Sequence, residues 1–146
     1  SKALVVGRLS LAGSLDIAPF LAFTYVENRG ISFGMMQGVG NGPLLAVNLV
    51  FTAIIYFYWR RRDLAGALNN WESRGLVLIL SGAIGNNIDR ILRGCVIDFV
   101  DLKVWPVFNI ADSAISIGVA FYLLGSLLSR RRAAKKGLKG LIVQKG

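Results

Sequence analysis

Three apolar stretches constrain this chain more than any other feature of its sequence. They cover residues 43–59, 75–92 and 108–128, and each approaches the roughly 20 residues that a helix needs to cross a bilayer. The whole chain is 54% hydrophobic and only 17% charged, which is more apolar than an ordinary soluble domain. We therefore predict a mostly α-helical membrane protein, in which a bundle of spanning helices is surrounded by membrane lipids.

The basic residues predict the orientation of these helices. The net charge is +9, seven of the seventeen lysines and arginines follow Ser129, and residues 60–62 form an arginine run behind the first apolar stretch. Because basic residues in short loops stay cytoplasmic, residues 60–74 and the C-terminal tail are predicted on the cytoplasmic side. Residues 93–107 and the N-terminal part then lie at the outer face. No nucleic-acid partner is expected, since no basic stripe interleaved with aromatic residues is present.

A segment rich in aromatic and β-branched residues predicts a small β-sheet before the first apolar stretch. Residues 20–26 have this composition and are followed by asparagine and glycine turn signals. We expect a short strand and turn that form a small sheet near residues 17–36, lying at the outer surface beside the helices. The chain is otherwise predicted to form one membrane-embedded domain, residues 1–129, followed by a frayed basic cytoplasmic tail, residues 130–146.

The rare residue types exclude several kinds of chemistry. The chain has no histidine, which removes histidine-based triads and the usual zinc sites, and the single Cys95 cannot form an internal disulfide. Cys95 has no histidine to activate it, so we interpret it as a loop thiol. A serine–lysine pair would require Lys103 to reach Ser113 or Ser116. Carboxylates, hydroxyls, lysines and backbone amides remain as chemical groups.

Two aspartates, Asp98 and Asp112, are the strongest catalytic candidates. Asp98 follows a turn marked by Gly94, and Asp112 lies about one turn into the third helix, so both are predicted at the outer face. Paired carboxylates hydrolyse peptides when one ionised group takes a proton from water and its protonated partner polarises the carbonyl. The alternative is that Asp112 caps a helix and Asp98 is a loop residue. Asp101 is interpreted as a solvated loop charge.

Polar residues interrupt the second apolar stretch. Asn86, Asp89 and Arg90 are three and four positions apart, which predicts that they share one helix face, and that face cannot contact lipid. They either belong to a functional site, or Asp89 and Arg90 neutralise partners while Asn86 bridges two helices. The small residues at 81–85 predict close packing of this helix against a neighbour.

Three separated motifs resemble one family, the lipoprotein signal peptidases, also called signal peptidase II, which are aspartic proteases of the bacterial inner membrane. The family's N-x-G-x-x-F element is matched by YVENRGISFG (25–34), and its G-N-x-x-D-R-x-x-x-G-x-V-x-D-F element by GNNIDRILRGCVIDF (85–99). Its F-N-x-A-D element is matched by FNIAD (108–112). The motifs follow the family's order, and the resemblance covers residues 1–128.

The resemblance implies a function and a set of site residues. It implies that Asp98 and Asp112 are the catalytic pair, and that the substrate site is lined or supported by Asn28, Gly30, Asn86, Asp89, Arg90 and Asn109. It further implies cleavage of a diacylglyceryl-modified prolipoprotein just before its lipidated cysteine, without metal or cofactor, and inhibition by globomycin. The expected location is the bacterial inner membrane, as a multi-pass protein with its active site at the outer, periplasmic face.

The family pattern departs from this sequence at the N-terminus. The family has four membrane helices, and the first carries a D-Q-x-[ST]-K element, of which Ser1 and Lys2 match only the end. We therefore expect the family's first helix to be missing from this sequence. Two other hypotheses remain: a non-catalytic membrane subunit or proton-relay component that uses the same aspartates, and an inactive fragment that binds lipopeptide without turnover.

Overall fold

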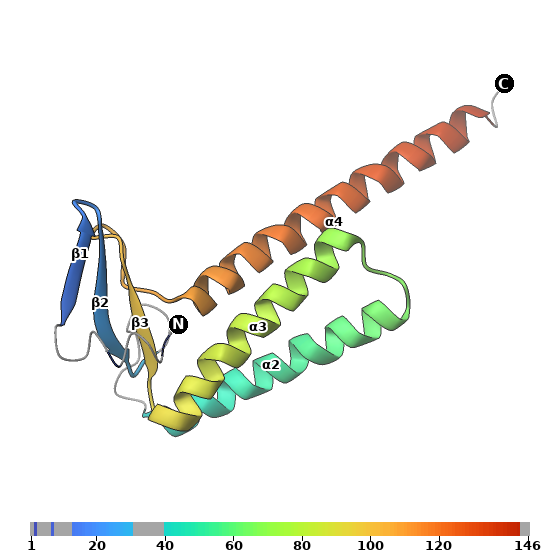
Figure 1. The fold of residues 1–146 in the computed structure, drawn as a ribbon. Coiled ribbons are helices and arrows are strands. Elements are labelled where there is room, and N and C mark those ends of the chain that lie inside the picture. Colours follow the sequence, from blue (N-terminus) through green and yellow to red (C-terminus); the bar gives the residue numbers. More distant parts are fainter. Residues whose placement is uncertain (1, 3–6, 8–12, 31–39, 144–146) are drawn as a thin grey trace.

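A computed structural model describes residues 2, 7, 13–30 and 40–143 of the chain (Figure 1). In chain order its elements are β1 (Ser14–Ala18), β2 (Leu21–Asn28), α2 (Asn41–Leu64), α3 (Asn70–Arg93), β3 (Val96–Asp101) and α4 (Ile110–Val143). Three helical segments are long and apolar enough to cross a membrane: Asn41–Leu64, Asn70–Arg93 and Ile110–Lys135. The prediction of a mostly helical, multi-pass membrane protein with three visible spans and a small sheet is confirmed.

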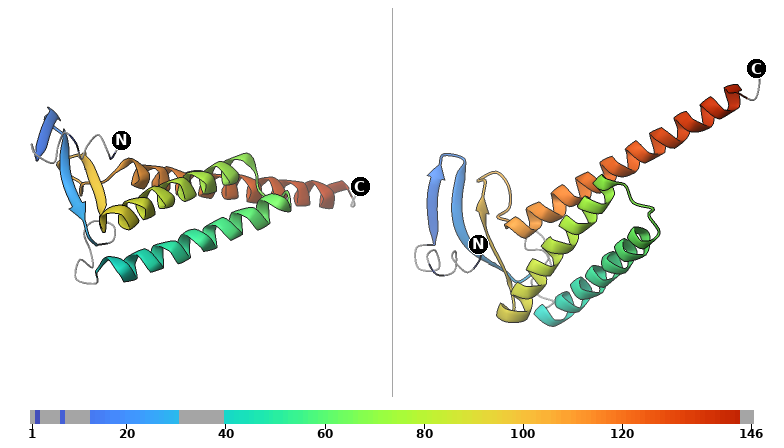
Figure 2. Two further views of the ribbon diagram at one scale, coloured as in Figure 1. Left: turned by 60° about the horizontal axis from the view of Figure 1, so that its bottom comes forward. Right: turned by 45° about the vertical axis from the view of Figure 1, so that its right-hand side comes forward.

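Helix α3 lies between the other two helices, and the sheet lies across one end of the bundle (Figures 1 and 2). Helices α2 and α3 form an antiparallel hairpin whose link, residues 65–69, is at the end far from the sheet. The arginine run 60–62 closes α2 at that end, and Ser129 of α4 contacts Asn69 there through a 2.8 Å hydrogen bond. The basic end of the bundle and the sheet end are therefore opposite, as the charge pattern predicts.

The sheet is antiparallel with the order β1-β2-β3. Strand β2 corresponds to the strand predicted at residues 20–26, and it pairs on one side with β1 and on the other with β3, where Phe23 faces Val100. The prediction of a small sheet near residues 17–36 is confirmed, and the sheet also includes residues from Ser14 and a third strand from residues 96–101. Residues 31–36 of that prediction lie outside the described part of the chain.

Glycines set the close approach of α3 and α4. A Cβ atom added to Gly118 would lie 2.6 Å from the Gly75 carbonyl oxygen and 2.9 Å from the Ile79 nitrogen. A Cβ on Gly82 would likewise collide with the backbone carbonyl of Ala111. The close packing predicted from the small residues at 81–85 is thus confirmed for Gly82, and it extends along the helix pair, because glycine alone lets the two backbones touch.

Replacement of Gly118 by alanine should therefore destabilise the protein by about 1–3 kcal/mol, because the backbone of α3 must move to admit a methyl group. Gly42→Ala in α2 is the matched control, since a Cβ there meets nothing within 4 Å. Thermal unfolding followed by circular dichroism in detergent micelles measures both variants. Equal unfolding midpoints for Gly118→Ala and Gly42→Ala would show that α3 and α4 can move apart at little cost in free energy.

Helix α4 is longer than expected. A frayed tail was predicted from residue 130, whereas the helix continues to Val143 without a break. The reason is intrinsic propensity, since arginine, lysine, alanine and leucine dominate this segment and all favour helix. At about 1.5 Å per residue, a helix this long exceeds the roughly 30 Å hydrocarbon layer. Its basic end therefore extends beyond the apolar span.

Candidate active site

Asp98 is positioned by the turn that ends α3. Gly94 follows the helix with a φ of 73°, a left-handed conformation that favours glycine, and donates its N–H to the carbonyl of Arg90. The chain then reverses into β3, where Asp98 lies opposite Val26 of β2 and is only 3% exposed. The predicted turn at Gly94 is confirmed, and the alternative that Asp98 is a loop residue is wrong.

Asp112 lies in the first turn of α4, at a helix start that Asn109 caps. The Oδ1 atom of Asn109 accepts hydrogen bonds from the backbone N–H groups of Ala111 and Asp112, at 2.7 and 3.2 Å. In return, Oδ2 of Asp112 accepts the backbone N–H of Asn109 at 3.1 Å. The alternative that Asp112 caps a helix is therefore confirmed. The capping hydrogen bond uses only the Oδ2 atom of Asp112, and its Oδ1 atom contacts other groups.

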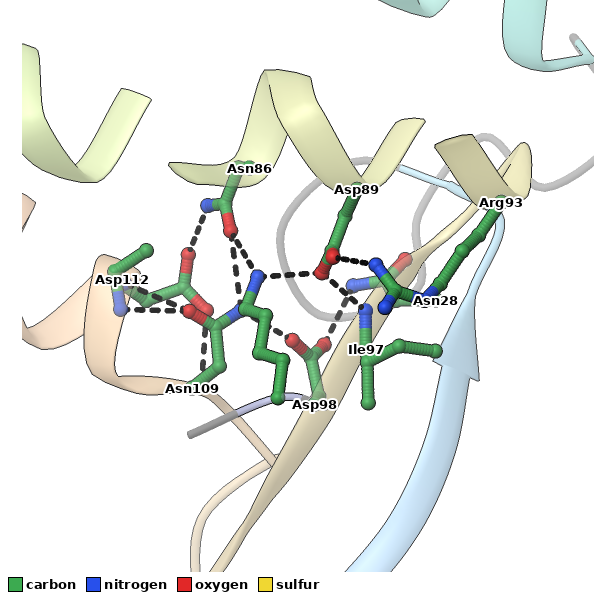
Figure 3. Close-up of polar contacts among 10 residues, drawn as sticks. Asn28, Asn86, Asp89, Arg93, Ile97, Asp98, Asn109 and Asp112 are labelled. Carbon is green, nitrogen blue, oxygen red and sulfur yellow. Dashed lines mark hydrogen bonds and ion pairs between the residues drawn. The ribbon is translucent and has the colours of Figure 1, made fainter. Parts of the chain in front are cut away.

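The Asn109 amide connects the two carboxylates (Figure 3). Its Nδ2 atom donates to Asp98 Oδ1 at 2.6 Å and lies 3.3 Å from Asn86 Oδ1. Asn86 in turn donates through Nδ2 to Asp112 Oδ1 at 2.8 Å, and Asn28 donates to Asp98 Oδ2 at 3.0 Å. The structure thus brings Asp98 and Asp112 into one hydrogen-bonded cluster, built from β2, α3, β3 and the start of α4. Asn109 is fully buried within it.

Asp89 lies beside this cluster and carries the local ion pairs (Figure 3). Its carboxylate contacts Lys2 Nζ and Arg93, both at 2.6 Å, and accepts the backbone N–H of Ile97 at 3.1 Å. Lys2 also donates to Asn86 Oδ1 at 2.9 Å. The interpretation that Asp89 neutralises charged partners is confirmed. Lys2 and Arg93 were not predicted as site residues. The signals that could have identified them are the spacing of four positions between Asp89 and Arg93 and the match of Lys2 to the last position of the D-Q-x-[ST]-K element.

Arg90 points away from Asp89, because each helical residue turns by about 100°. Its guanidinium donates to the carbonyl of buried Gly30, and its Nη1 atom lies 3.5 Å from Asn41 Oδ1. Arg90 forms no ion pair among the described residues, so the interpretation that it neutralises a charge is wrong for that part of the chain. Gly30 donates its N–H to Asn28 Oδ1 at 3.0 Å, which ties Arg90 to the strand that holds Asn28.

A cavity of about 260 Å³ lies next to the cluster, between α2, α3 and α4. Five of the eight predicted site residues line it: Asn28, Asn86, Arg90, Asp98 and Asp112. The other three are not part of its lining: Gly30 and Asn109 hydrogen-bond to lining residues, whereas Asp89 is connected to the lining through Lys2, which also donates to Asn86. Much of the remaining wall is apolar, including Phe51 of α2 and Ile115 of α4. Asn87 also lines the cavity, and its only sequence signal is its place in the polar half of the second span.

Burial raises the pKa of Asp98 above that of an ordinary aspartate. Hydrogen bonds from Asn109 and Asn28 oppose this rise in pKa because they stabilise the ionised form. The nearby charge of Asp112 raises the pKa further, and the charge of Lys2 lowers it. The net effect is a raised pKa, so Asp98 keeps its proton to higher pH than an ordinary aspartate does. A carboxylic acid that keeps its proton beside a second carboxylate is the arrangement that two-carboxylate hydrolysis requires.

The weaker chemical alternatives do not assemble. Lys103 pairs with Asp16 at 2.9 Å, and the Ser113 hydroxyl lies 3.4 Å from the carbonyl of Asn109, so no serine–lysine pair forms between them. Cys95 lies in the bend between α3 and β3 and is 3% exposed, and burial raises the pKa of its thiol. A buried thiol of raised pKa is a poor nucleophile.

These features define a class: a multi-pass helical membrane protein with two carboxylates in one cluster at the end of the bundle, beside a largely apolar cavity. The model of the signal peptidase (SPase) II family matches residues 1–128, and the chain belongs to that family.

Known proteins support this assignment. The chain is 41% identical over 132 residues to a lipoprotein signal peptidase of Thermodesulfovibrio yellowstonii, covering 87% of this chain and 84% of that protein. It is 45% identical over 112 residues to one of Syntrophomonas wolfei, covering 77% and 72%. A solved bacterial membrane enzyme, determined by the in meso method at 2.3 Å resolution, superposes with a TM-score of 0.73 at 30% identity, covering 88% of this chain and 78% of that one.

Proposed function

We propose that this chain is an aspartic endopeptidase that removes the signal peptide from diacylglyceryl-modified prolipoproteins, cleaving just before the lipidated cysteine. The observation that carries the proposal is the shared cluster of Asp98 and Asp112, which opens onto a cavity with a polar end and an apolar remainder. Relatives named lipoprotein signal peptidase support the same reaction.

In this proposal Asp98 carries the shared proton and Asp112 is ionised. Asp112 takes a proton from water, whose oxygen attacks the carbonyl carbon of the scissile peptide bond, while the acid of Asp98 donates a hydrogen bond to the carbonyl oxygen. The tetrahedral intermediate then collapses as the leaving amine nitrogen accepts a proton from the pair, and the carbon–nitrogen bond breaks. Deep burial of Asp98 supports this assignment of the proton.

The cavity also fits the proposed substrate. Arg90 lines the cavity and its buried Nε atom has no hydrogen-bond partner among the described residues, so it can donate to a peptide carbonyl of the bound chain. The apolar walls suit acyl chains and the apolar signal peptide. A globomycin-type inhibitor is expected to occupy the same cavity. The basic end of the bundle supports a cytoplasmic orientation for that end, and hence a periplasmic site in the bacterial inner membrane.

A proton-relay component is the less favoured function. A relay would place its carboxylates near the middle of the bilayer, where ions must cross. Asp112 instead lies in the first turn of α4, and Asp98 lies in the sheet outside the spans. Both aspartates line the cavity at the sheet end of the bundle, where a substrate in the membrane surface would enter.

The direct test is release of the signal peptide from a purified lipid-modified prolipoprotein by the purified protein in detergent or vesicles. The proposal expects one cleavage, immediately before the lipidated cysteine, that globomycin inhibits and that an unmodified prolipoprotein does not undergo. Mass spectrometry of both products identifies the bond. Binding of globomycin without any cleavage would instead indicate the inactive, lipopeptide-binding alternative.

Replacement of Asn28 by leucine should move the upper limb of the pH–activity profile to higher pH. Asn28 stabilises the ionised form of Asp98, so its loss raises the pKa of Asp98 further, and the pair keeps its shared proton to higher pH. The measurement is kcat/KM against pH. Thr24→Val on the same strand is the control, because Thr24 donates to Asp101 instead, and it should leave the limb in place. A limb displaced to lower pH in Asn28→Leu would contradict the assignment.

A further inference from the structure

One polar group in the cavity has no role in the proposed mechanism. Asn87 lines the cavity on the side of α2 and is only 5% exposed. Its Nδ2 atom donates to the hydroxyl of Thr52 at 3.0 Å, but its Oδ1 atom is buried without a hydrogen-bond partner among the described residues. A buried acceptor without a donor is unfavourable, so a ligand that supplies a donor gains binding energy there.

The Thr52 hydroxyl fixes which way this amide points. Its oxygen lies 2.7 Å from the backbone carbonyl of Asn48, to which it donates. A hydroxyl has a single proton, so the Thr52 oxygen can only accept from Asn87. The NH₂ group of Asn87 must therefore face Thr52, and its Oδ1 atom is the group that no described residue contacts as a donor.

Asn87 also shares a helix stripe with the catalytic cluster. The residues of α3 that line the cavity are Ala83, Asn86, Asn87 and Arg90, which are spaced as one face of a helix. Asn86 binds Asp112, and the Nε donor of Arg90 has no partner in the described part of the chain. This face consequently offers one unused acceptor and one unused donor beside the carboxylates. An extended peptide segment, with its alternating N–H and C=O groups, complements such a pair.

The chemistry of the proposed substrate limits what can supply the donor. The diacylglyceryl group contains a thioether and two esters, all of which only accept hydrogen bonds. The N–H groups in a helical signal peptide are already bonded within the helix. The free donors are backbone N–H groups of the segment that must be unwound for hydrolysis.

We propose that the Oδ1 atom of Asn87 accepts a backbone N–H of the unwound signal peptide next to the scissile bond, which makes Asn87 a specificity-determining residue. The inference rests on the proposed function. Asn87 occupies an unspecified position of the G-N-x-x-D-R element, so this contact is a property of this chain and does not follow from the motif.

The test replaces single amide bonds of a lipid-modified substrate peptide by esters, which removes one N–H at a time. For the parent protein, one ester position within the segment flanking the cleavage site should lower kcat/KM roughly 5- to 10-fold, the effect of one lost hydrogen bond. Asn87→Leu should show a loss of similar size with the all-amide peptide and no further loss with that ester. Ser81→Ala is the matched control on the same helix, because the exposed Ser81 hydroxyl donates to Val77 of its own helix and Ser81 is not among the cavity-lining residues, so it should behave as the parent.

Three outcomes separate the explanations. The proposal is overturned if the parent protein shows no difference between the all-amide peptide and any ester peptide. It is also overturned if Asn87→Leu shows the same difference as the parent, which would mean that water or a neighbouring helix supplies the donor to Asn87. Fluorescence anisotropy gives the affinity of each labelled peptide, so the comparison does not depend on turnover. A parent protein that discriminates the ester in binding but never cleaves would refute the proposed function while supporting the contact. If Asn87→Leu does not fold, the smaller variant Asn87→Ala serves in the same comparison.

Discussion

Asparagine in place of Asp98 or Asp112 is expected to abolish signal-peptide release, with kcat/KM falling roughly 10²–10⁴-fold or more. The amide has nearly the shape of the carboxyl group but cannot take a proton from water or hold the shared proton, so the loss is chemical and the fold persists. The double variant should be hardly worse than either single variant, because the two groups act as a unit. Product formation by mass spectrometry and globomycin binding, measured together, separate lost chemistry from lost structure.

Asp101→Asn is the matched control for this experiment. Asp101 lies on the same strand, three residues after Asp98, where it accepts hydrogen bonds from Thr24 and from the backbone of Lys103. It does not line the cavity, so the variant should cleave at nearly the parental rate. Parental rates in Asp98→Asn and Asp112→Asn as well would exclude the carboxylate pair and favour a non-catalytic membrane subunit.

The second large effect is expected at Asn109. Serine there keeps an oxygen that can cap α4 but removes the amide that donates to Asp98 and Asn86, so activity should fall roughly 10-fold or more, the effect of two lost hydrogen bonds. The loss of this donor also raises the pKa of Asp98, so the upper limb of the pH profile should move to higher pH. Rates across the pH range, together with thermal unfolding, measure both effects.

Two comparisons make the Asn109 result interpretable. Ser113→Ala, one turn further along α4, removes only a hydroxyl 3.4 Å from the Asn109 carbonyl and should change neither rate nor pH profile. Asn109→Asp keeps the capping oxygen and adds a third carboxylate, which should lower activity more than serine does. If Asn109→Ser instead loses stability in proportion to activity, Asn109 is only a helix cap.

The sequence predicts the helices far better than the sheet. Each span follows from a continuous apolar run, which is a local signal. Strand β3 carries no comparable signal, because residues 96–99 are buried on both faces and its partner β2 lies about 70 positions earlier in the chain. Pairing over such a separation depends on how the helices fold back, which no local pattern contains.

The residues of the candidate site could be predicted from the sequence, but the hydrogen bonds that join them could not. Asp98 and Asp112 were expected at one membrane face from the charge pattern alone, and the structure brings them into one cluster. That Asn109 joins them depends on the cap geometry at the start of α4, which sequence spacing does not specify. Helical spacing also predicted that Asn86, Asp89 and Arg90 share one helix face. In the structure, Asn86 and Arg90 line the cavity together with Asn87, whereas Asp89 does not.

The glycine contacts between α3 and α4 have a further consequence for how the site behaves in a membrane. Asn86 and Asp112 lie on helices that meet backbone against backbone, so their helices cannot come closer together. Among the described residues, α2 has no such glycine contact, and it is largely exposed along its length. A tilt of α2 would therefore change the width of the cavity without changing the spacing of Asn86 and Asp112. The width of the cavity and the spacing of Asn86 and Asp112 are in this way set by different pairs of helices.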